Sequence, residues 1–377
     1  MALTSPLSAF ASRLRALIKT SADWETVFTD RSFNGLALEL LQLQMKSNPV
    51  FQRFVEGRNL EQMEHWSQIP ALPTSGFKEF ELSCLLPAER SRMFQSSGTT
   101  GQRPSCHYHS EESLRLYEDS AWACFESRFL DSSPPGSFGS ILVLTPPPSQ
   151  APHSSLVHMF EVVRQRMPGA NAAYTAKVTE QGSWDLDLVA TLEALQSAGS
   201  ARLPVLVLGT AFSFVHLLDQ MSARKLKFRL PAGSRAMETG GYKGRSRSVL
   251  KAELHKLVCG QLGIGPDCLI SEYGMSELSS QAYDGGPPND PRAPAPHSGP
   301  RLFRFPPWAR VHIISPETGQ EVGLGEMGLI RVFDLANTFS VMAIQTEDLG
   351  IRHADGFQLA GRAALAENRG CSLMPAA

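Results

Sequence analysis

Short apolar runs that alternate with helical patterns constrain the fold of this 377-residue chain most strongly. Each run is bounded by turn residues, as buried strands are, and the patterns between the runs are typical of amphipathic helices. The runs cover residues 140–146, 204–210 and 267–274, and the helical patterns cover 154–167, 187–198, 213–225 and 248–263. This alternation predicts an α/β fold with a mostly parallel sheet, in which ligands bind beyond the C-terminal ends of the strands.

The two ends of the chain show other patterns. Residues 1–70 are predicted to be helical, and basic residues interrupt the apolar ones near the N-terminus, so we expect no signal peptide there. A Pro- and Gly-rich stretch over 284–300 precedes segments that alternate as β-strands do. We therefore expect three parts: an α/β core with N-terminal helices (1–300), a β-rich subdomain (301–362) and a short tail that carries Cys371 (363–377).

Composition excludes several classes of partner. The chain has 35 basic and 37 acidic side chains, so its net charge of −2 gives no bulk attraction for nucleic acid or an anionic membrane. No run of about 18 apolar residues is present, so we expect no membrane span. Six cysteines without a CxxC pair, and no export signal, predict reduced thiols and a cytoplasmic location.

The stretch "SSGTTG" is a candidate phosphate-binding loop. Its glycines allow backbone conformations that present successive N–H groups to an anion, and its hydroxyls add donors. The glycines are Gly98 and Gly101, and the hydroxyls belong to Ser96, Ser97, Thr99 and Thr100. The Walker pattern is absent, and the alternative is an ordinary Ser/Thr/Gly surface turn.

A second motif, "ISEYGMSEL" (270–278), follows an apolar run. The Tyr273 ring can stack on a base, the Ser276 hydroxyl can meet phosphate, and the Glu277 carboxylate can hold Mg²⁺. Gly274 lies between them. The alternative is a strand–turn–helix in which Ser276 caps the helix.

Two further segments carry ligand-binding chemistry. In "TEDLGIRHADGFQLAGR" (346–362), Asp348 can accept hydrogen bonds from ribose hydroxyls and Arg362 ends the element; the alternative is an ordinary Asp-Gly hairpin. In "METGGYKGRSR" (237–247), Gly240 and Gly241 allow close approach to a flat ligand. The basic residues that follow them in this segment could face phosphate. The alternative is that they lie on the solvent-exposed first turn of a helix.

Together and in this order, the four segments resemble the ATP-binding motifs of the acyl-adenylate-forming superfamily. Further stretches, among them "IPALPTSGFKEF", "GTAFSFVHLLD" and "NRGCSL", narrow the resemblance to the LuxE-type acyl-protein synthetase family, from about residue 35 to residue 373. The resemblance implies the adenylate-forming N-terminal domain, with mostly parallel sheets flanked by helices. Because 15 residues follow Arg362, it also implies that the mobile C-terminal lid domain and its lysine are absent. Arg103, Lys243 and Arg245 are the candidates to replace that lysine.

The resemblance implies a ligase that uses ATP and Mg²⁺ to activate a carboxylic acid, typically a fatty acid, as acyl-AMP. The acyl group would then pass to Cys371 as a thioester and on to a partner reductase or acyltransferase. By the same resemblance, each motif residue has a role. The ATP phosphates would be cradled by Ser96, Ser97, Gly98, Thr99, Thr100 and Gly101 and contacted by Ser276. The adenine would be bordered by Gly240 and Gly241 and would meet Tyr273 and Gly274. Glu277 would hold Mg²⁺, Asp348 and Arg362 would bind the ribose, and Cys371 would accept the acyl group.

Two other functions stay open. Adenylation with transfer to an external thiol, CoA or a carrier protein, would leave Cys371 without a role. A non-catalytic nucleotide- or acyl-binding scaffold is the third reading. The apolar residues of two helical stretches are either an acyl pocket or ordinary core: Leu156, Met159, Phe212, Phe214 and Leu217. His153 is a candidate near the carboxylate, whereas His107 and His109 are predicted to share one side of a strand rather than form a zinc site.

Overall fold

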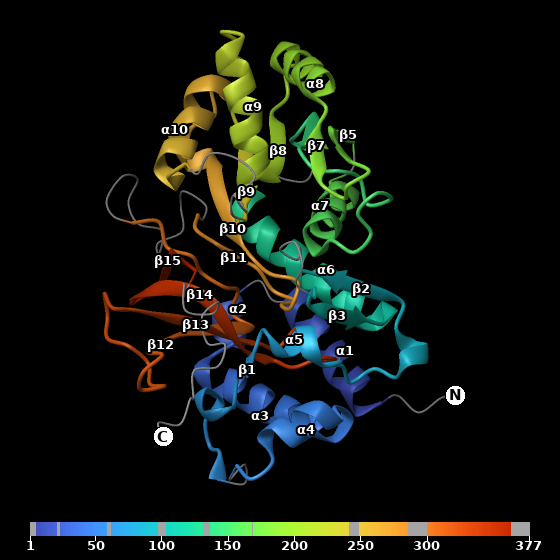
Figure 1. Cartoon of the computed structure of the whole chain (residues 1–377), viewed down its shortest axis with the longest axis vertical. Helices are drawn as coiled ribbons and strands as arrows, with labels where there is room; N and C mark the ends of the chain where they lie inside the picture. The colour runs from blue at the N-terminus through green and yellow to red at the C-terminus, as the bar shows by residue number, and fades with distance from the viewer. Residues whose placement is uncertain are drawn as a thin grey trace, which may run out of the picture.

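The computed structural model describes residues 5–20, 23–58, 62–96, 103–130, 136–167, 169–240, 249–285 and 300–362. Within these ranges a six-stranded sheet and a five-stranded sheet organise the chain (Figure 1). No helix in the described ranges has the length and apolar character needed to span a bilayer. The predicted α/β class is confirmed by the sheet and helix arrangement described below.

The six-stranded sheet is parallel apart from the edge strand β11. In spatial order it contains β11 (Ala282–Tyr283), β10 (Leu269–Tyr273), β9 (Arg235–Thr239), β8 (Val205–Thr210), β4 (Ser140–Val143) and β5 (Asn171–Tyr174). Only β11 runs antiparallel to its neighbour β10. The three apolar runs of the sequence form β4, β8 and β10, so all three predicted strands are confirmed.

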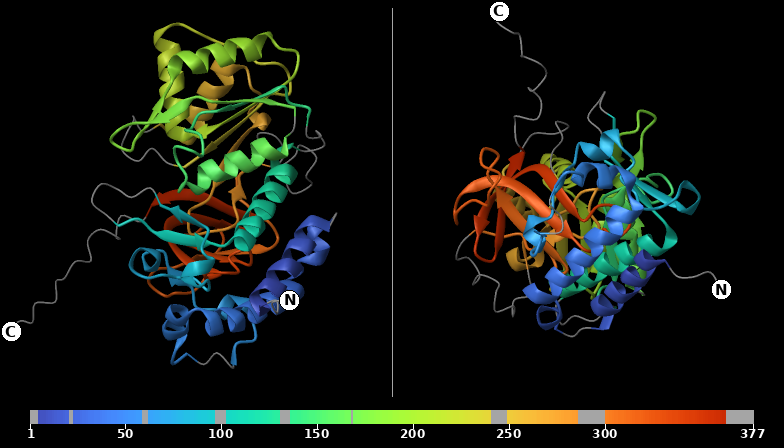
Figure 2. Two further views of the ribbon diagram at one scale, coloured as in Figure 1. Left: turned by 90° about the vertical axis from the view of Figure 1, so that its right-hand side faces the viewer. Right: turned by 90° about the horizontal axis from the view of Figure 1, so that it is seen from below.

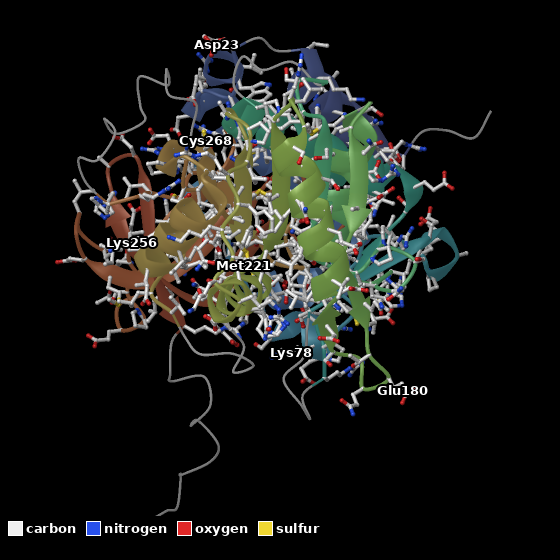
Figure 3. The ribbon with its side chains drawn as sticks, turned by 90° about the horizontal axis from the view of Figure 1, so that it is seen from above. Asp23, Lys78, Glu180, Met221, Lys256 and Cys268 are labelled. Atoms are coloured by element: carbon white, nitrogen blue, oxygen red, sulfur yellow. The ribbon has the colours of Figure 1, made fainter. Side chains whose placement is uncertain are left out.

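Helices cover both faces of this sheet. They are α6 (Glu111–Phe125), α7 (Ser155–Arg166), α8 (Leu188–Ser200), α9 (Ala211–Ala223) and α10 (Lys251–Leu262). Val205 and Val207 of β8 pack in a core cluster with α8, α9 and α10, whereas Leu206 and Leu208 pack in the cluster that includes α6 and α7. Strands buried on both faces need apolar residues at every position, which explains the unbroken apolar runs. Figure 3 looks down on the outer layer, where Met221 marks α9 and Lys256 marks α10.

The five-stranded sheet is built mainly from the C-terminal part of the described chain. It contains β12 (Ala309–Ile314), β13 (Met327–Asp334), β14 (Ala343–His353) and β15 (Gly356–Arg362), joined as antiparallel neighbours. The predicted Asp-Gly hairpin is present, because His353 pairs with Gly356 where β14 turns into β15. The domain boundaries at residues 300 and 362 stay a prediction.

The N-terminal segment completes the five-stranded sheet, which the sequence did not indicate. Strand β1 (Leu72–Pro73) pairs parallel with β14. Helix α3 (Asp30–Ser47) sends the buried Gln44 side chain to the turn after β13, where its Nε2 donates to the carbonyl oxygen of Asn337 at 2.8 Å and its Oε1 accepts from the backbone N–H of Met342 at 3.1 Å. Figure 2 shows the N-terminal helices at the opposite end of the molecule from α8, α9 and α10.

The remaining elements are short or belong to the N-terminal region. They are α1 (Pro6–Thr20), α2 (Trp24–Val27), α4 (Pro49–Val55), α5 (Gly76–Glu79), the hairpins β2 (Arg92–Gln95) with β3 (Cys106–His109) and β6 (Ala176–Val178) with β7 (Trp184–Leu186), and the single turns Trp66–Gln68, Pro87–Glu89, Glu126–Leu130 and Pro266–Cys268. Ser110 caps α6, because its Oγ accepts from the backbone N–H of Ser113 at 3.2 Å. The Ser113 Oγ in turn accepts from the backbone N–H of Ser110 at 3.0 Å, which completes a capping box.

A buried carboxylate at the end of β13 joins the two sheets. Asp334 is fully buried, and its Oδ2 accepts from the backbone N–H groups of Ser279 (2.9 Å) and Ser280 (2.8 Å), which follow β10. Its Oδ1 accepts from the Ser280 hydroxyl at 2.7 Å and from the Ala336 N–H at 3.0 Å. Burial raises the pKa of Asp334 to about 6 although these donors lower it, so the carboxylate is ionised at neutral pH.

Replacing Asp334 by Asn should destabilise the fold by about 2–4 kcal/mol, because either orientation of the amide turns an NH₂ group towards two donors and leaves them unpaired. Urea unfolding at pH 7.5 measures this. Asp355→Asn, in the exposed hairpin turn, is the matched control and should change the free energy of unfolding by less than about 0.5 kcal/mol. Equal urea midpoints for Asp334→Asn and wild type would contradict the role given to this carboxylate.

Candidate active site

Two neighbouring strands of the parallel sheet end at the predicted motifs. The β9–β10 register pairs Thr239 with Glu272, which brings Gly240 beside Tyr273. Gly240 has a φ of +74°, a conformation that favours glycine, and no described atom lies within 4 Å of the position that a Cβ would take. The backbone at the strand end is therefore open to a flat ligand. Gly241 lies outside the described residues.

Tyr273, Asp348 and Arg362 meet in one group that is joined by a hydrogen bond and an ion pair. The Tyr273 hydroxyl donates to Asp348 Oδ2 at 2.9 Å, and Arg362 Nε lies 3.4 Å from Asp348 Oδ1 across the β14–β15 pair. The Tyr273 ring is 6% exposed and lies edge-on against the rings of Phe303 and Phe357. The structure thus brings together three predicted site residues from two separate motifs.

Burial decides the protonation of this group. It raises the pKa of Tyr273 well above its usual value, so the phenol stays a hydrogen-bond donor. Burial also raises the pKa of Asp348, while the Tyr273 hydrogen bond and the Arg362 charge lower it. The Arg362 side chain is 70% exposed, which leaves its guanidinium accessible to a ligand.

Ser276 and Glu277 present two oxygen donors side by side. The Ser276 hydroxyl donates to Glu277 Oε2 at 3.0 Å, and both residues are buried. The Asn337 amide holds this turn by donating to the carbonyl oxygen of Glu277 at 2.8 Å. Residues 274–281 form turns and no helix, so Ser276 caps none there. Adjacent carboxylate and hydroxyl oxygens suit a hard cation that takes its other ligands from phosphate.

The hairpin β2–β3 carries Ser96, the described residue of the candidate phosphate loop. Its neck is closed at Ser96, whose N–H donates to the carbonyl oxygen of Ser105 at 3.1 Å and whose Oγ accepts from the Ser105 N–H at 2.9 Å. Arg103 is exposed next to this neck. Other predicted residues lie outside the described ones: Ser97, Gly98, Thr99, Thr100, Gly101, Lys243, Arg245 and Cys371.

A buried histidine links this hairpin to the Ser276 turn. His107 of β3 is 3% exposed, and its Nδ1 lies 2.9 Å from the carbonyl oxygen of Ser276. The ring of His109 lies 4.3 Å away, so both histidines share one side of the strand as predicted. The described ranges contain no group of three or more potential metal-ligating side chains. Sequence reasoning missed the His107 contact because the partner lies 169 residues away.

A buried acid on β10 was also missed. The Thr239 hydroxyl donates to Glu272 Oε2, and burial raises the pKa of Glu272 to about 7. A Cβ at Gly274 would lie 2.3 Å from Glu272 Oε1, so this carboxyl group occupies the space that a side chain at residue 274 would need. The sequence signal was present: a charged residue inside the otherwise apolar strand "LISEY" is unusual.

The suggested acyl-binding side chains divide between the two faces of the sheet. Phe214 and Leu217 of α9 are buried in the cluster with α8 and α10, whereas Met159 of α7 is buried in the other cluster. These residues therefore form no single pocket. His153 is exposed and its Nδ1 lies 3.1 Å from the carbonyl oxygen of Met93 on β2, which places it next to the phosphate-loop hairpin.

Comparisons with known proteins agree with this architecture. A family model described as "Acyl-protein synthetase, LuxE" matches residues 16–376. A search of curated proteins found no match. Among solved structures, 2-hydroxyisobutyryl-CoA ligase in an open conformation with 2-HIB-AMP and CoA superposes with a TM-score of 0.61 at 14% identity, covering 85% of this chain and 65% of that chain.

The same ligase in its thioesterification state, again with 2-HIB-AMP and CoA, also has a TM-score of 0.61, at 15% identity over 89% of this chain. This chain spans about two thirds of the length of that ligase, 65% in both comparisons. At such identity the likeness shows the fold alone, and it confirms the predicted adenylate-forming N-terminal domain.

The His107 contact predicts a pH-dependent stability. Burial lowers the pKa of His107 to about 4, against about 6.5 in an unfolded chain, so acidification below pH 6.5 protonates the unfolded chain first. Stability that is present above pH 6.5 is thus lost as the pH falls towards 4. The variant His107→Asn keeps a donor for Ser276 but has no titrating ring. Its free energy of unfolding should therefore fall by about 2 kcal/mol less than that of wild type between pH 7.5 and pH 5.0.

Urea unfolding at the two pH values measures this difference. His153→Asn is the matched control, because His153 makes the same kind of contact to a backbone carbonyl but is exposed. It should follow the wild-type pH dependence. The same pH dependence in His107→Asn and wild type would mean that His107 is not held neutral in the folded protein.

Proposed function

Because the chain belongs to the LuxE acyl-protein synthetase family, we propose that it activates a carboxylic acid with ATP and transfers the acyl group to Cys371. The observation that carries the proposal is the meeting of Tyr273, Asp348 and Arg362 at the end of β10. One motif supplies the tyrosine and another supplies the other two residues. The hydrogen bond and the ion pair between them form a polar edge of the kind that fixes a ribose, next to the open backbone at Gly240.

The nucleotide would lie across the ends of β9 and β10. In this arrangement Asp348 accepts from the ribose hydroxyls, and the exposed Arg362 guanidinium donates to ribose or phosphate oxygens. Tyr273 keeps the Asp348 carboxylate in place and is the proposed neighbour of the adenine, together with Gly240, Gly241 and Gly274. The phosphates would then run towards the hairpin neck at Ser96, with residues Ser97 to Gly101 as their cradle.

The acid is activated by exchanging a poor leaving group for a good one. A carboxylate oxygen attacks the α-phosphorus, the bond to pyrophosphate breaks, and acyl-AMP forms. The protein contributes positioning and charge stabilisation in this step. Bound Mg²⁺ would neutralise phosphate charge. Glu277 and Ser276 are the residues proposed to hold it through their side-chain oxygens. The Asn337 amide and His107 hold the same turn by contacts to the backbone carbonyl oxygens of Glu277 and Ser276.

A thiolate completes the reaction. The Cys371 sulfur attacks the acyl-AMP carbonyl, AMP leaves, and a thioester forms. Arg369, two residues before, favours the thiolate form electrostatically. The product would be delivered to a protein acceptor such as a reductase or acyltransferase. Transfer to an external thiol instead is the alternative, and the first test below separates the two.

Incubating the protein with MgATP and a panel of carboxylic acids should add one acyl mass, removable by hydroxylamine, and Cys371→Ser should abolish the adduct. Intact-mass spectrometry measures this. Cys268→Ser is the control, because Cys268 is a partly exposed free thiol at the other end of the parallel sheet from the site. Acid-dependent pyrophosphate release without an adduct would move the acceptor outside the chain. Absence of both would argue for the scaffold.

Asp348→Asn should raise the KM for ATP in acid-dependent ATP–pyrophosphate exchange by about tenfold or more, because a charged hydrogen-bond acceptor is lost. Tyr273→Phe removes the hydroxyl that orients this carboxylate and should raise the same KM by a smaller factor. Asp355→Asn is the control and should match wild type. An unchanged KM for ATP in Asp348→Asn would remove this residue from the nucleotide site.

A further inference from the structure

The strands that carry Asp348 and Arg362 are each interrupted by a β-bulge. Where β13 pairs with β14, residues 346–348 of β14 lie opposite Ile330 alone. Where β14 pairs with β15, Ala360 has no residue opposite it. Bulges interrupt the hydrogen-bond ladder and re-aim the side chains around them, and they are frequent beside active sites. Both proposed ribose ligands therefore lie at irregular points of neighbouring strands.

The Thr346 hydroxyl bridges the first bulge. Its Oγ1 donates to the carbonyl oxygen of Ile330 at 2.8 Å and accepts from the backbone N–H of Asp348 at 3.1 Å. One side chain thus serves a backbone acceptor on β13 and a backbone donor on β14, groups that need partners when they are buried. Thr346 is 2% exposed, so water has little access to replace these bonds.

The same hydroxyl lies beside the nucleotide group. Burial raises the pKa of Tyr273 and the nearby Thr346 hydroxyl lowers it, which places these two side chains next to each other. The Tyr273 hydroxyl in turn donates to Asp348 Oδ2. Asp348 is therefore held at its backbone by Thr346 and at its carboxylate by Tyr273, which fixes the direction of its side-chain oxygens.

Gly361 makes the second bulge possible. Its φ of +129° is a conformation that L side chains rarely adopt, and no described atom lies within 4 Å of the position that a Cβ would take. The backbone conformation, and not a lack of space, therefore favours glycine here. The next residue, Arg362, pairs with Asp348 across the two strands, and its Nε lies 3.4 Å from Asp348 Oδ1.

We propose that these two bulges aim Asp348 and Arg362 at the ribose of ATP, with Thr346 as the positioning residue for Asp348, and that they make the site selective for an intact ribose. The inference rests on the proposed function, because it takes ATP as the ligand of this group. A carboxylate held in one direction selects against a ligand that lacks the matching hydroxyl, since the acceptor is then left unpaired. Thr346 touches no ligand in this arrangement and acts through Asp348.

The contacts of Gln345 explain why the effect of Thr346 should centre on Asp348. The Gln345 Nε2 also donates to the Ile330 carbonyl oxygen, at 3.1 Å, while its Oε1 accepts from Arg331 Nε at 2.9 Å. The Ile330 carbonyl oxygen therefore keeps a donor when the Thr346 hydroxyl is removed. No second side chain among the described residues accepts from the Asp348 N–H, so Thr346→Val disturbs the position of Asp348 more than the β13–β14 pairing.

Isothermal titration calorimetry of the full chain with magnesium chloride tests the inference without knowledge of the acid. The probes are ATP, 2′-deoxy-ATP and 3′-deoxy-ATP. Wild type should bind ATP about tenfold or more tightly than at least one deoxy analogue, because the missing hydroxyl leaves an Asp348 oxygen without its donor. Comparison of the two analogues identifies the hydroxyl that Asp348 accepts.

The variants test the positioning role. Thr346→Val should weaken ATP binding by about tenfold and lower the preference over the deoxy analogue by a similar factor, because the Asp348 backbone is no longer held. Thr346→Ser keeps the hydroxyl and should bring both quantities to within about threefold of wild type. Thr191→Val is the matched control and should match wild type, because this buried threonine on α8 also donates to a backbone carbonyl, that of Asp187 at 2.7 Å.

Two further variants separate positioning from general destabilisation. In the Asp348→Asn background, Thr346→Val should change ATP binding by less than about threefold, because two changes that act through one contact are not additive. Gly361→Ala forces an unfavourable backbone conformation before Arg362 and should also weaken ATP binding. Circular dichroism checks that each variant is folded, and Gly361→Ala tests the bulges even where Thr346→Val does not fold.

Several outcomes would overturn the inference. Equal affinity of wild type for ATP and both deoxy analogues would remove the ribose selectivity, and an unchanged preference in folded Thr346→Val would remove Thr346 from the site. Additive effects in the double variant would mean that Thr346 acts on stability alone. These results would leave the proposed adenylation intact, since acid-dependent pyrophosphate exchange measures it separately. Absence of ATP binding by wild type would overturn both the inference and the proposed function.

Discussion

The Asp334 carboxylate is the point on which the two sheets depend. Its four accepted hydrogen bonds come from Ser279, Ser280 and Ala336, so the turn after β10 and the end of β13 share one buried anion. A buried charge is tolerated only when donors surround it, and here backbone N–H groups supply most of them. The site residues on the same turn, Ser276 and Glu277, inherit their position from this arrangement.

Neighbouring side chains extend the same network in three directions. Asn337 links the β13 turn to the carbonyl oxygen of Glu277, and Gln44 links it to α3. The Ser280 hydroxyl also contacts that of Ser120 on α6, which accepts from the Trp308 indole. Buried polar networks of this kind are stabilising only when their members are paired. The buried serines of the "MSELSS" stretch therefore have a structural role in this network, separate from the ligand binding proposed for Ser276 and Glu277.

The sequence predicted features that depend on local pattern. Apolar runs located β4, β8 and β10, and the Asp-Gly pair located the β14–β15 hairpin. The resemblance assigned Tyr273, Asp348 and Arg362 to one nucleotide site, and the structure brings these three side chains together by a hydrogen bond and an ion pair. Roles in catalysis and the boundaries of the domains remain predictions, since no contact in the described structure tests them.

Features that depend on contacts between distant segments could not be read from pattern. Strand β1 is two residues long, and its pairing with β14 has no periodic signal. The contact from Gln44 to Asn337 spans 293 residues, and that from His107 to Ser276 spans 169. The hydrogen bond from Tyr273 to Asp348 joins residues that are 75 positions apart in the sequence. Because each of these hydrogen bonds requires a long stretch of chain to be in place, the candidate site exists only in the completed fold, and we expect the loss of any one of these contacts to disturb the fold and the site together.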